Sequence, residues 1–436
     1  MDKECHIYVF LLTFLKLYVL VMDMRDIFQS VKAASRKLAI VADATRNAVL
    51  ETLADKIEAK GDVLLDANSR DLARMDRKSA LYDRLQLNKG RLMDIARSIR
   101  EVASLSSPLG RILMERTLAN GLVLRKVSVP FGVIGVVYEA RPNVTFDVFS
   151  LCLKSGNACV LKGGSDAEES NKVAMSLIHE ALKENGVDAT VAEMLPSTHE
   201  ATSMMLNAVG FVDVCIPRGG RKLIDFVRET AQVPVIETGA GVVSTYFDSK
   251  GDVEKGRRIV ENAKTRRVSV CNALDCLIVD SNRLADVPSL CSPLAGHNVR
   301  IYADDKAFAI LENNYPTELL CHATVDSYGT EFMDYAMALK IVDGVDEAIE
   351  HIAEYGSCHS ESIVTEDKDT ARYFQQRVDA ACVYWNAPTS FTDGGQFGLG
   401  AEIGISTQKL GPRGPMGLEE MTTYKWLVDG NGQVRP

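Results

Sequence analysis

A cysteine among small and polar residues is the first group in this sequence that could do covalent chemistry. Cys271 lies in the run VSVCNALD, shortly after Arg266 and Arg267. A free thiol has a pKa of about 8.5, and neighbouring cations lower it and favour the nucleophilic thiolate. The local pattern alone favours a buried core cysteine over a nucleophile, so the rest of the chain must decide.

Glycines and cations directly follow several of the expected strands. In parallel sheets, ligands bind at the carboxyl ends of the strands, where glycine-rich turns and helix N-termini offer N–H groups to anions. A single glycine pair is weak evidence, because tight turns need glycine anyway. Several such ends in one sheet predict a nucleotide site, with Lys162, Arg218 and Arg221 as its cations. The runs concerned are EARPN (139–143), KGGS (162–165), PRGGR (217–221) and ETGAG (237–241).

Several familiar motifs are missing from the sequence. It has no G-x-G-x-x-G, G-x-x-x-x-G-K-[ST], H-E-x-x-H or G-x-S-x-G run. These absences disfavour a standard dinucleotide fingerprint, a P-loop kinase, a zincin and an α/β-hydrolase. The seven histidines show no metal-ligand spacing, and we expect no metal site. The net charge of −10, from 49 Lys and Arg against 59 Asp and Glu, disfavours nucleic-acid binding.

Helices and strands alternate over most of the chain, after a helical start at 24–107. Short apolar strands separated by helices are typical of parallel βαβ units with both sheet faces covered. The length of 436 residues suggests two or three domains. We expect two α/β lobes and a β appendage that ends in a hairpin at 422–435. The expected strands are 132–139, 158–162, 211–216, 233–236, 274–279, 338–342, 361–365 and 381–386.

The first residues form a separate question. His6–Met22 is an apolar run, but an acidic head precedes it, Lys16 interrupts it and no A-x-A site follows it. Met24 begins an amphipathic helix. We therefore expect residues 1–23 to be an extension or an over-called start, in preference to a membrane anchor. Ten cysteines without a C-x-x-C pair favour free thiols in a reducing cytoplasm.

Longer runs of the sequence resemble the gamma-glutamyl phosphate reductases (glutamate-5-semialdehyde dehydrogenases), a family of the aldehyde dehydrogenase superfamily. The resemblance extends from about Met24 to the C-terminus. Its most specific runs are VPFGVIGVVYEARPNVTFDV, VCIPRGGRKLI, VPVIETGAGV, NAKTRRVSVCNALD and FGLGAEIGISTQKLGPRGPMG. One departure is Ser269-Val270, where the family usually has Pro-Gly before the cysteine.

The resemblance implies an aldehyde dehydrogenase-like α/β fold, with two Rossmann-like lobes and a small β oligomerisation arm. The implied division is an extension at 1–23, an NADPH-binding domain at 24–115, 130–236 and 380–404, a catalytic domain at 237–379, and the arm at 116–129 and 405–436.

The resemblance also assigns catalytic roles. Cys271 would attack the carbonyl of L-glutamyl 5-phosphate, expel phosphate and form a thioester. The Asn143 amide and the N–H of Cys271 would hold the developing oxyanion. Glu237 matches the superfamily's general base, but a hydrogen-bonding residue at a strand end is an equally open interpretation, because this reduction needs no activated water. Arg141 is our own candidate for the substrate phosphate, since guanidinium fits phosphate geometry.

NADPH is the cofactor that the resemblance implies. Lys162 and Ser165, with Gly164 between them, match the segment that binds the adenosine ribose. The turn at Gly219 and Gly220 would lie under the pyrophosphate and nicotinamide. Glu331 matches the glutamate that holds the nicotinamide ribose, although an exposed helix-start carboxylate is the alternative.

The expected partners follow from the same resemblance. We expect a homo-oligomer, no membrane contact, and an association with the glutamate 5-kinase that makes the labile acyl phosphate, because this chain has no kinase motif. Two other functions remain open: a reductase of a different acyl phosphate or acyl-CoA, and a catalytically silent homologue that only binds a nucleotide or a partner.

Overall fold

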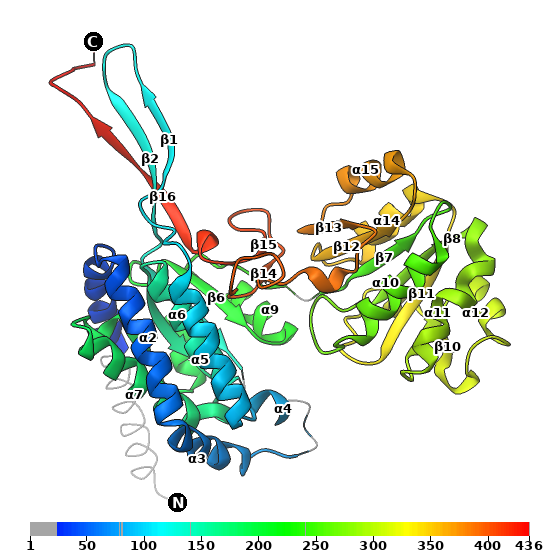
Figure 1. The fold of residues 1–436 in the computed structure, drawn as a ribbon, viewed down its shortest axis with the longest axis horizontal. Helices are drawn as coiled ribbons and strands as arrows, with labels where there is room; N and C mark the ends of the chain where they lie inside the picture. The colour runs from blue at the N-terminus through cyan, green and yellow to red at the C-terminus, as the bar shows by residue number, and fades with distance from the viewer. Residues whose placement is uncertain (1–23, 78, 80–81, 140, 240, 436) are drawn as a thin grey trace, which may run out of the picture. The chain divides into compact units, whose positions relative to one another are not determined.

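The chain divides into two compact units in the computed structural model, which describes residues 24–77, 79, 82–139, 141–239 and 241–435 (Figure 1). Unit 1 holds Met1–Glu237, Leu399–Gly404 and Met416–Pro436, and unit 2 holds Thr238–Gly398 and Ile405–Pro415. The predicted extension at 1–23 lies outside the described residues. No helix among the described residues is long and apolar enough to span a membrane.

A four-stranded parallel sheet in the order β5-β4-β3-β6 forms the centre of unit 1. Every residue of β3 is buried, as expected for a strand covered on both faces. The predicted strand at 233–236 is wrong: only an isolated bridge joins Val235 to Cys215, and Pro234 has no N–H to donate. The strands are β3 (Val133–Tyr138), β4 (Ala158–Lys162), β5 (Ala192–Met194) and β6 (Val214–Arg218).

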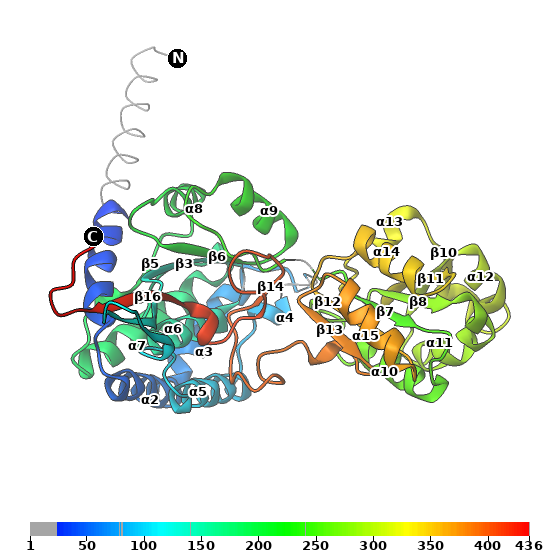
Figure 2. The same ribbon diagram turned by 90° about the horizontal axis from the view of Figure 1, so that it is seen from above.

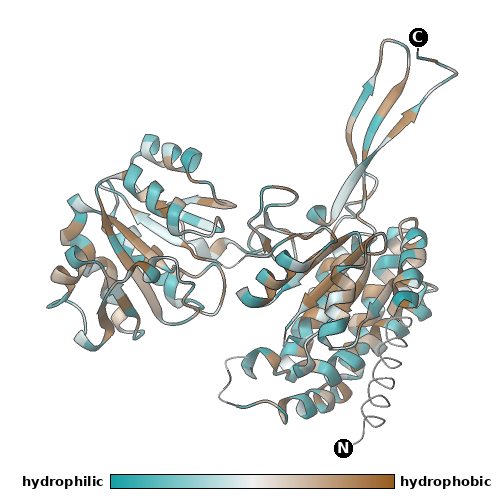
Figure 3. Cartoon of the chain, turned by 180° about the vertical axis from the view of Figure 1, so that it is seen from behind, coloured by the Kyte–Doolittle hydropathy of each residue, from teal (hydrophilic) through white to brown (hydrophobic). Residues whose placement is uncertain are grey.

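Helices cover this sheet with their apolar stripes. Val49, Leu50, Leu53 and Ile57 on α2 are fully buried, at the spacing that places them on one face. Figure 3 shows the resulting pattern, with apolar strands beneath helices whose outer faces are hydrophilic. The helices are 24–38, α2 (Asp43–Ala59), α3 (Gly61–Leu72), α4 (Tyr82–Leu85), α5 (Lys89–Ser104), α6 (Pro142–Lys154), α7 (Glu168–Glu184), α8 (His199–Leu206) and α9 (Arg221–Thr230).

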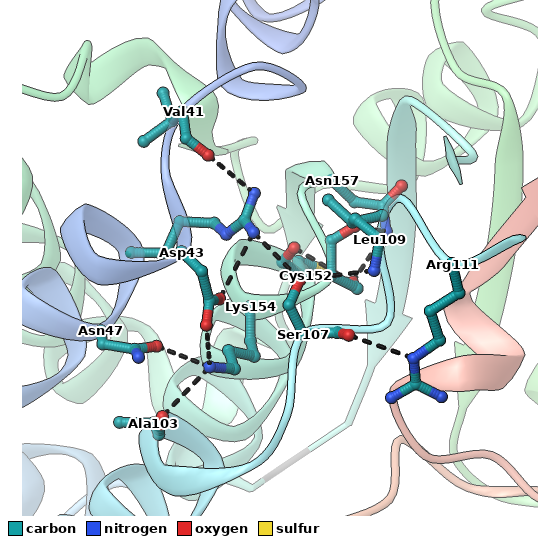
Figure 4. A network of polar contacts seen from close by, with 12 residues as sticks. Val41, Asp43, Asn47, Ala103, Ser107, Leu109, Arg111, Cys152, Lys154 and Asn157 are labelled. Carbon is teal, nitrogen blue, oxygen red and sulfur yellow. Dashed lines mark hydrogen bonds and ion pairs between the residues drawn. The ribbon is translucent and has the colours of Figure 1, made fainter. Parts of the chain in front are cut away.

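A buried lysine fixes the end of α6 (Figure 4). The Lys154 side chain has no exposed surface, and its Nζ donates to Asn47 Oδ1 at 2.6 Å, Asp43 Oδ2 at 3.1 Å and the carbonyl of Ala103 at 3.1 Å. Arg46 also pairs with Asp43, at 3.3 Å. These contacts join α6 to α2 and α5, because a buried ammonium is tolerated only when it is paired and hydrogen-bonded.

Three strands of unit 1 form a separate antiparallel sheet, in the order β1-β2-β16. These strands are β1 (Ile112–Thr117), β2 (Val123–Pro130) and β16 (Thr422–Asp429). The predicted C-terminal hairpin is wrong. All eight residues of β16 instead pair antiparallel with β2, a strand that lies far from β16 in the sequence.

Unit 2 contains a seven-stranded parallel sheet, in the order β10-β9-β11-β8-β7-β12-β13. Leu277 and Val279 of β8 pack with α10, α11 and α12, whereas Cys276 and Ile278 pack with α14 and α15 on the opposite face (Figure 2). This alternation is the two-residue period of a strand. The strands are β7 (Ser244–Phe247), β8 (Cys276–Asp280), β9 (Arg300–Ala303), β10 (Leu320–His322), β11 (Ala336–Val342), β12 (Ser360–Val364) and β13 (Cys382–Trp385); the helices are α10 (Val253–Thr265), α11 (Val287–Ala295), α12 (Asp305–Leu311), α13 (Val325–Tyr328), α14 (Val345–Tyr355) and α15 (Lys368–Arg377).

The sheet of unit 2 corrects part of the expected domain division. Residues 380–404 were expected in the cofactor domain, but β13 pairs with β12 in unit 2, and the chain returns to unit 1 only at Leu399. Residues 405–415, expected in the arm, also group with unit 2, where β14 (Ile405–Ser406) pairs with β15 (Gly414–Pro415).

Candidate active site

Cys271 lies in a turn of unit 2 that links α10 to β8. The N–H of Ala273 donates to the carbonyl of Val270 at 3.1 Å and closes this turn. The Cys271 side chain is partly accessible, unlike the buried thiols of the same chain. Burial raises the pKa of Cys215 and of Cys291 to about 12, which keeps both protonated. The buried cysteines are 152, 159, 215, 276, 291 and 382.

Two segments remote in sequence hold the backbone of this turn. A β-carbon added to Gly241 would lie 1.8 Å from the carbonyl oxygen of Cys271, so the two main chains are in direct contact. The N–H of Gly241 donates to Glu331 Oε1 at 3.1 Å. The predicted nucleophile and the predicted ribose-binding glutamate are therefore linked through one glycine.

Two buried ionisable side chains, those of Asp275 and Lys264, belong to the segments on either side of this turn. Asp275 accepts hydrogen bonds from the N–H groups of Phe332 at 3.0 Å and Val243 at 3.4 Å. Lys264, with no exposed surface, donates to the carbonyl of Leu274 at 2.9 Å. Burial raises the pKa of Asp275 and lowers that of Lys264. Asp275 thus joins the segment of Glu331 to the segment of Gly241.

The residue after Cys271 is anchored separately. Asn272 is buried, and its Nδ2 donates to the carbonyl of Thr392 at 2.9 Å. The Thr389 hydroxyl donates to the carbonyl of Asn272 at 3.0 Å. These bonds tie the turn to the loop that follows β13.

The predicted oxyanion residue belongs to unit 1, at the start of α6. Arg141 is the N-cap of this helix, Pro142 is its first residue and Asn143 follows, partly buried. Asn143 Nδ2 donates to Asp147 Oδ2 at 2.9 Å. Burial raises the pKa of Asp147 to about 6, while the Asn143 hydrogen bond and the charge of Arg218 act in the opposite direction.

A cavity of about 730 Å³ lies where β4 and β5 end. Gly163 and Gly164 line one part of it, and residues 194–197 after β5 line another. A β-carbon on Gly163 would come within 2.4 Å of Asn171 Nδ2, so glycine is needed here for a close approach. Lys162 precedes this turn half-buried, and burial lowers its pKa. Ser165 is exposed and begins a short 3₁₀ turn before α7.

The second glycine turn follows β6. The N–H of Gly220 donates to Glu139 Oε2 at 2.9 Å, and a β-carbon on Gly219 would come within 2.7 Å of the same carboxylate. Glu237 lies near the end of unit 1, where its Oε2 is 3.7 Å from Arg228 Nη1.

The structure divides the predicted site residues between the units. Arg141 and Asn143 are neighbours at the start of α6. Lys162 ends β4, Gly164 and Ser165 follow it, Gly219 and Gly220 follow β6, and Glu237 lies two residues after the isolated bridge at Val235. Cys271 and Glu331 are brought together in unit 2. Sequence reasoning missed Asp275 and Asp147, and it placed Gly241 in a nucleotide-binding run without its contact to Cys271. Asp147 carried a signal, because it lies four residues after Asn143 on a helix that is otherwise largely apolar.

Comparison with known proteins identifies the family, although no family model matches the chain. The gamma-glutamyl phosphate reductase of Bacteroides thetaiotaomicron is 58% identical over 413 residues, which cover 95% of this chain and 99% of the relative. That of Pelodictyon phaeoclathratiforme is 56% identical over 407 residues, which cover 93% of this chain and 97% of the relative.

Solved structures agree with these relatives. A crystal structure of the gamma-glutamyl phosphate reductase of Thermotoga maritima matches with a TM-score of 0.90 and 39% identity, over 94% of this chain and 99% of that chain. An acetylating aldehyde dehydrogenase of Geobacillus thermoglucosidasius shares the fold, with a TM-score of 0.69 at 16% identity, over 96% of this chain and 99% of that chain. The protein therefore belongs to the gamma-glutamyl phosphate reductase family, oxidoreductases of the second step of proline biosynthesis.

Proposed function

We propose that the chain reduces L-glutamyl 5-phosphate with NADPH, through a thioester on Cys271. The observation that supports this proposal is the turn of Cys271. Its thiol is partly accessible, and its backbone is held by the contact with Gly241 and by the hydrogen bonds of Asn272. The buried thiols elsewhere in the chain are poor nucleophiles, because burial raises the pKa of a thiol.

The side chains of Cys271 and Asn143 carry out the covalent step. The Cys271 thiolate adds to the carbonyl carbon of the acyl phosphate, the carbon–oxygen bond to phosphate breaks, and inorganic phosphate leaves. The amide of Asn143 stabilises the negative charge that develops on the carbonyl oxygen, an effect worth about 3 kcal/mol for a well-placed donor. Reduction of the thioester then breaks the carbon–sulfur bond, so that the semialdehyde leaves and the thiolate is regenerated.

The residues present fit a nicotinamide dinucleotide phosphate. The cavity beside Gly163 and Gly164 suits an adenosine, and Lys162 supplies a cation for a 2′-phosphate. Glu331 would hold the nicotinamide ribose. When bound, NADPH supplies the hydride that reduces the thioester. An engineered glycolyl-CoA reductase with bound NADP⁺, which matches with a TM-score of 0.65 at 16% identity, supports the fold's ability to hold this cofactor.

Two further residues receive roles. Arg141 binds the substrate phosphate, since it is the N-cap residue two positions before Asn143 and guanidinium fits phosphate geometry. Arg141→Ala should then raise the KM for the acyl phosphate, with less change in the KM for NADPH. Glu237 pairs with Arg228 near the end of unit 1. It is no general base, because hydrolysis of the thioester would be a side reaction. Glu237→Gln should therefore retain most of the activity.

The direct test is the reverse reaction, phosphate-dependent oxidation of glutamate semialdehyde with NADP⁺. Wild-type protein should be active, Cys271→Ser inactive, and Cys321→Ser, which changes another partly accessible thiol, active. Mass spectrometry of protein quenched during turnover should find an acyl adduct on Cys271. Activity that depends on coenzyme A instead of phosphate would favour an acyl-CoA reductase, and binding without turnover would favour a silent homologue.

The three-stranded arm supports a homo-oligomer. Its strands expose several apolar side chains, among them Ile112 at 58%, Val428 at 55% and Trp426 at 45%. Both outer strands also leave backbone groups that another chain could pair. Light scattering should show an oligomer, and Trp426→Ser with Val428→Ser should shift it toward the monomer.

A cytoplasmic location and an association with glutamate 5-kinase complete the proposal. No disulfide joins the nine cysteines among the described residues, which suits a reducing compartment. The kinase would supply an acyl phosphate too labile to diffuse far. Co-purification of the two enzymes at cellular concentration tests the association, and failure to co-purify would contradict it.

A further inference from the structure

The side chains of Asn143 and Asp147 form a matched pair on α6. The two residues are four apart, a spacing that places side chains on the same face of a helix, one turn apart. Asn143 Nδ2 donates to Asp147 Oδ2 at 2.9 Å, an ordinary length for a hydrogen bond. Both residues are partly buried, so their contact is only partly open to competition by water.

The chemistry of a carboxylate determines which way the amide faces. An ionised carboxylate only accepts hydrogen bonds, whereas an amide presents a donor nitrogen at one end and an acceptor oxygen at the other. The Asp147 carboxylate therefore selects the nitrogen of Asn143 and excludes the flipped orientation. The amide nitrogen has two hydrogens, so one remains for an oxyanion while the other is held by Asp147.

The surroundings keep this carboxyl group in place. Asp147 is on the helix whose far end Lys154 ties to α2 and α5, so its backbone is held by the core of unit 1. Arg218, at the end of β6, is the cation whose charge acts on Asp147. Burial raises the pKa of Asp147 to about 6, so the group is mostly ionised near neutral pH and becomes protonated in mild acid.

We propose that Asp147 is a positioning residue, which orients the Asn143 amide so that its nitrogen faces the developing oxyanion. The inference rests on the proposed function, since it assigns a second residue to the oxyanion donor. Asp147 acts only through Asn143. Its loss should therefore lower kcat and the rate of acylation of Cys271, and leave the KM for NADPH unchanged.

A double-mutant cycle tests this dependence. Asp147→Ala should lower kcat about 10-fold or more, the size expected when a charge-assisted hydrogen bond that orients a catalytic group is lost. Asp147→Asn should lower kcat less, because its amide oxygen can still accept a hydrogen bond from Asn143. In the Asn143→Ala background, Asp147→Ala should cause almost no further loss. Equal losses in both backgrounds, or an unchanged kcat, would overturn the proposal.

A pH profile provides the readout that a purely structural role would not change. In wild-type protein, kcat should fall below about pH 6, where protonation lets the carboxyl group donate and so admit the flipped amide. Asp147→Asn should lack this acidic limb, and a limb that persists would contradict the proposal. If Asp147→Ala fails to fold, Asp147→Asn carries both measurements.

Separate controls distinguish the failure of this inference from that of the proposed function. Asp94→Asn, on the exposed surface of α5, should match wild type in every measurement. Wild-type protein without phosphate-dependent activity would refute the proposed function itself. Active wild-type protein with independent effects at positions 143 and 147 would refute only the positioning role.

Discussion

Gly241 and Cys271 touch through their main chains, at a distance that leaves no room for a side chain on the glycine. A β-carbon at Gly241 would lie 1.8 Å from the carbonyl oxygen of Cys271 and 2.9 Å from its α-carbon. Real β-carbons do not approach backbone atoms this closely, so glycine is required here for close approach.

Gly241→Ala should therefore displace the turn that carries Cys271. We expect activity to fall at least 100-fold, because a shift of about 1 Å at a reacting group can cost that much. The rate at which iodoacetamide alkylates Cys271 should change as well. Gly296→Ala is a matched control in the same unit, since its added β-carbon would meet its nearest neighbour at an ordinary 3.5 Å. Full activity in Gly241→Ala would contradict the close contact.

Asp147 should lower stability while it supports catalysis. Its folded pKa of about 6 exceeds the ordinary 3.8, so between these values the folded protein keeps a proton that the unfolded chain has lost. Stability therefore falls as the pH rises from about 4 to about 6, by up to about 3 kcal/mol at 1.36 kcal/mol per unit. Asp147→Asn removes this cost, so its gain in melting temperature over wild type should grow from about pH 4 to about pH 6 and stay level above pH 6. A difference that does not change with pH would contradict this.

Much of unit 1 could be predicted from the sequence because its signals are local, although the strand at 233–236 and the C-terminal hairpin were wrong. The helical start, the buried strand at 132–139 and the glycines after 158–162 and 211–216 all have composition that marks them directly. The rule that ligands bind at carboxyl strand ends located the cavity beside Gly163.

The arrangement in unit 2 could not be predicted in the same way. Cys271, Gly241 and Glu331 all precede strands of one parallel sheet, namely β8, β7 and β11, so they gather at the amino ends of these strands. Composition does not reveal which strands are neighbours, and β7, β9 and β10 are too short to show a clear period. The contact between Gly241 and Cys271 is visible only once the strands are ordered.

Glu331 should affect the turn of Cys271 as well as the cofactor. Its Oε1 accepts the N–H of Gly241, and a glutamine can keep that bond but has a weaker acceptor for ribose hydroxyls. We expect Glu331→Gln to raise the KM for NADPH and leave alkylation of Cys271 unchanged, whereas Glu331→Ala should change both. Equal effects of the two variants on alkylation would show that Gly241 does not depend on this carboxylate.

The buried Lys154 makes unit 1 sensitive to changes at Asp43. Asp43→Ala would leave the ammonium of Lys154 buried without its carboxylate partner, a loss that typically costs about 3 kcal/mol or more. The expected result is a lower urea midpoint for unit 1. Asp94→Asn, which alters an exposed pair on α5, should change the midpoint little. An unchanged midpoint in Asp43→Ala would mean that Asn47 and the carbonyl of Ala103 suffice.

Lys162 should decide the preference between NADPH and NADH. Burial lowers the pKa of this lysine, so a 2′-phosphate beside it would restore a favourable charge interaction that NADH cannot provide. Loss of one such charge-assisted contact costs about 1.5–3 kcal/mol, so Lys162→Met should raise the KM for NADPH roughly 10- to 100-fold. The KM for NADH should change little.

Lys172, a cation that lines the cavity beside Gly163, provides the control for this preference. Lys172 already pairs with Glu168 at 2.9 Å and Glu169 at 3.1 Å, so its charge is largely compensated within the protein. Lys172→Met should therefore have the smaller effect on the KM for NADPH. If both variants weaken the binding of NADPH and NADH equally, the lysines shape the cavity and do not recognise the 2′-phosphate. A selective loss of NADPH binding in Lys162→Met alone would assign the cofactor preference to the charge at the end of β4.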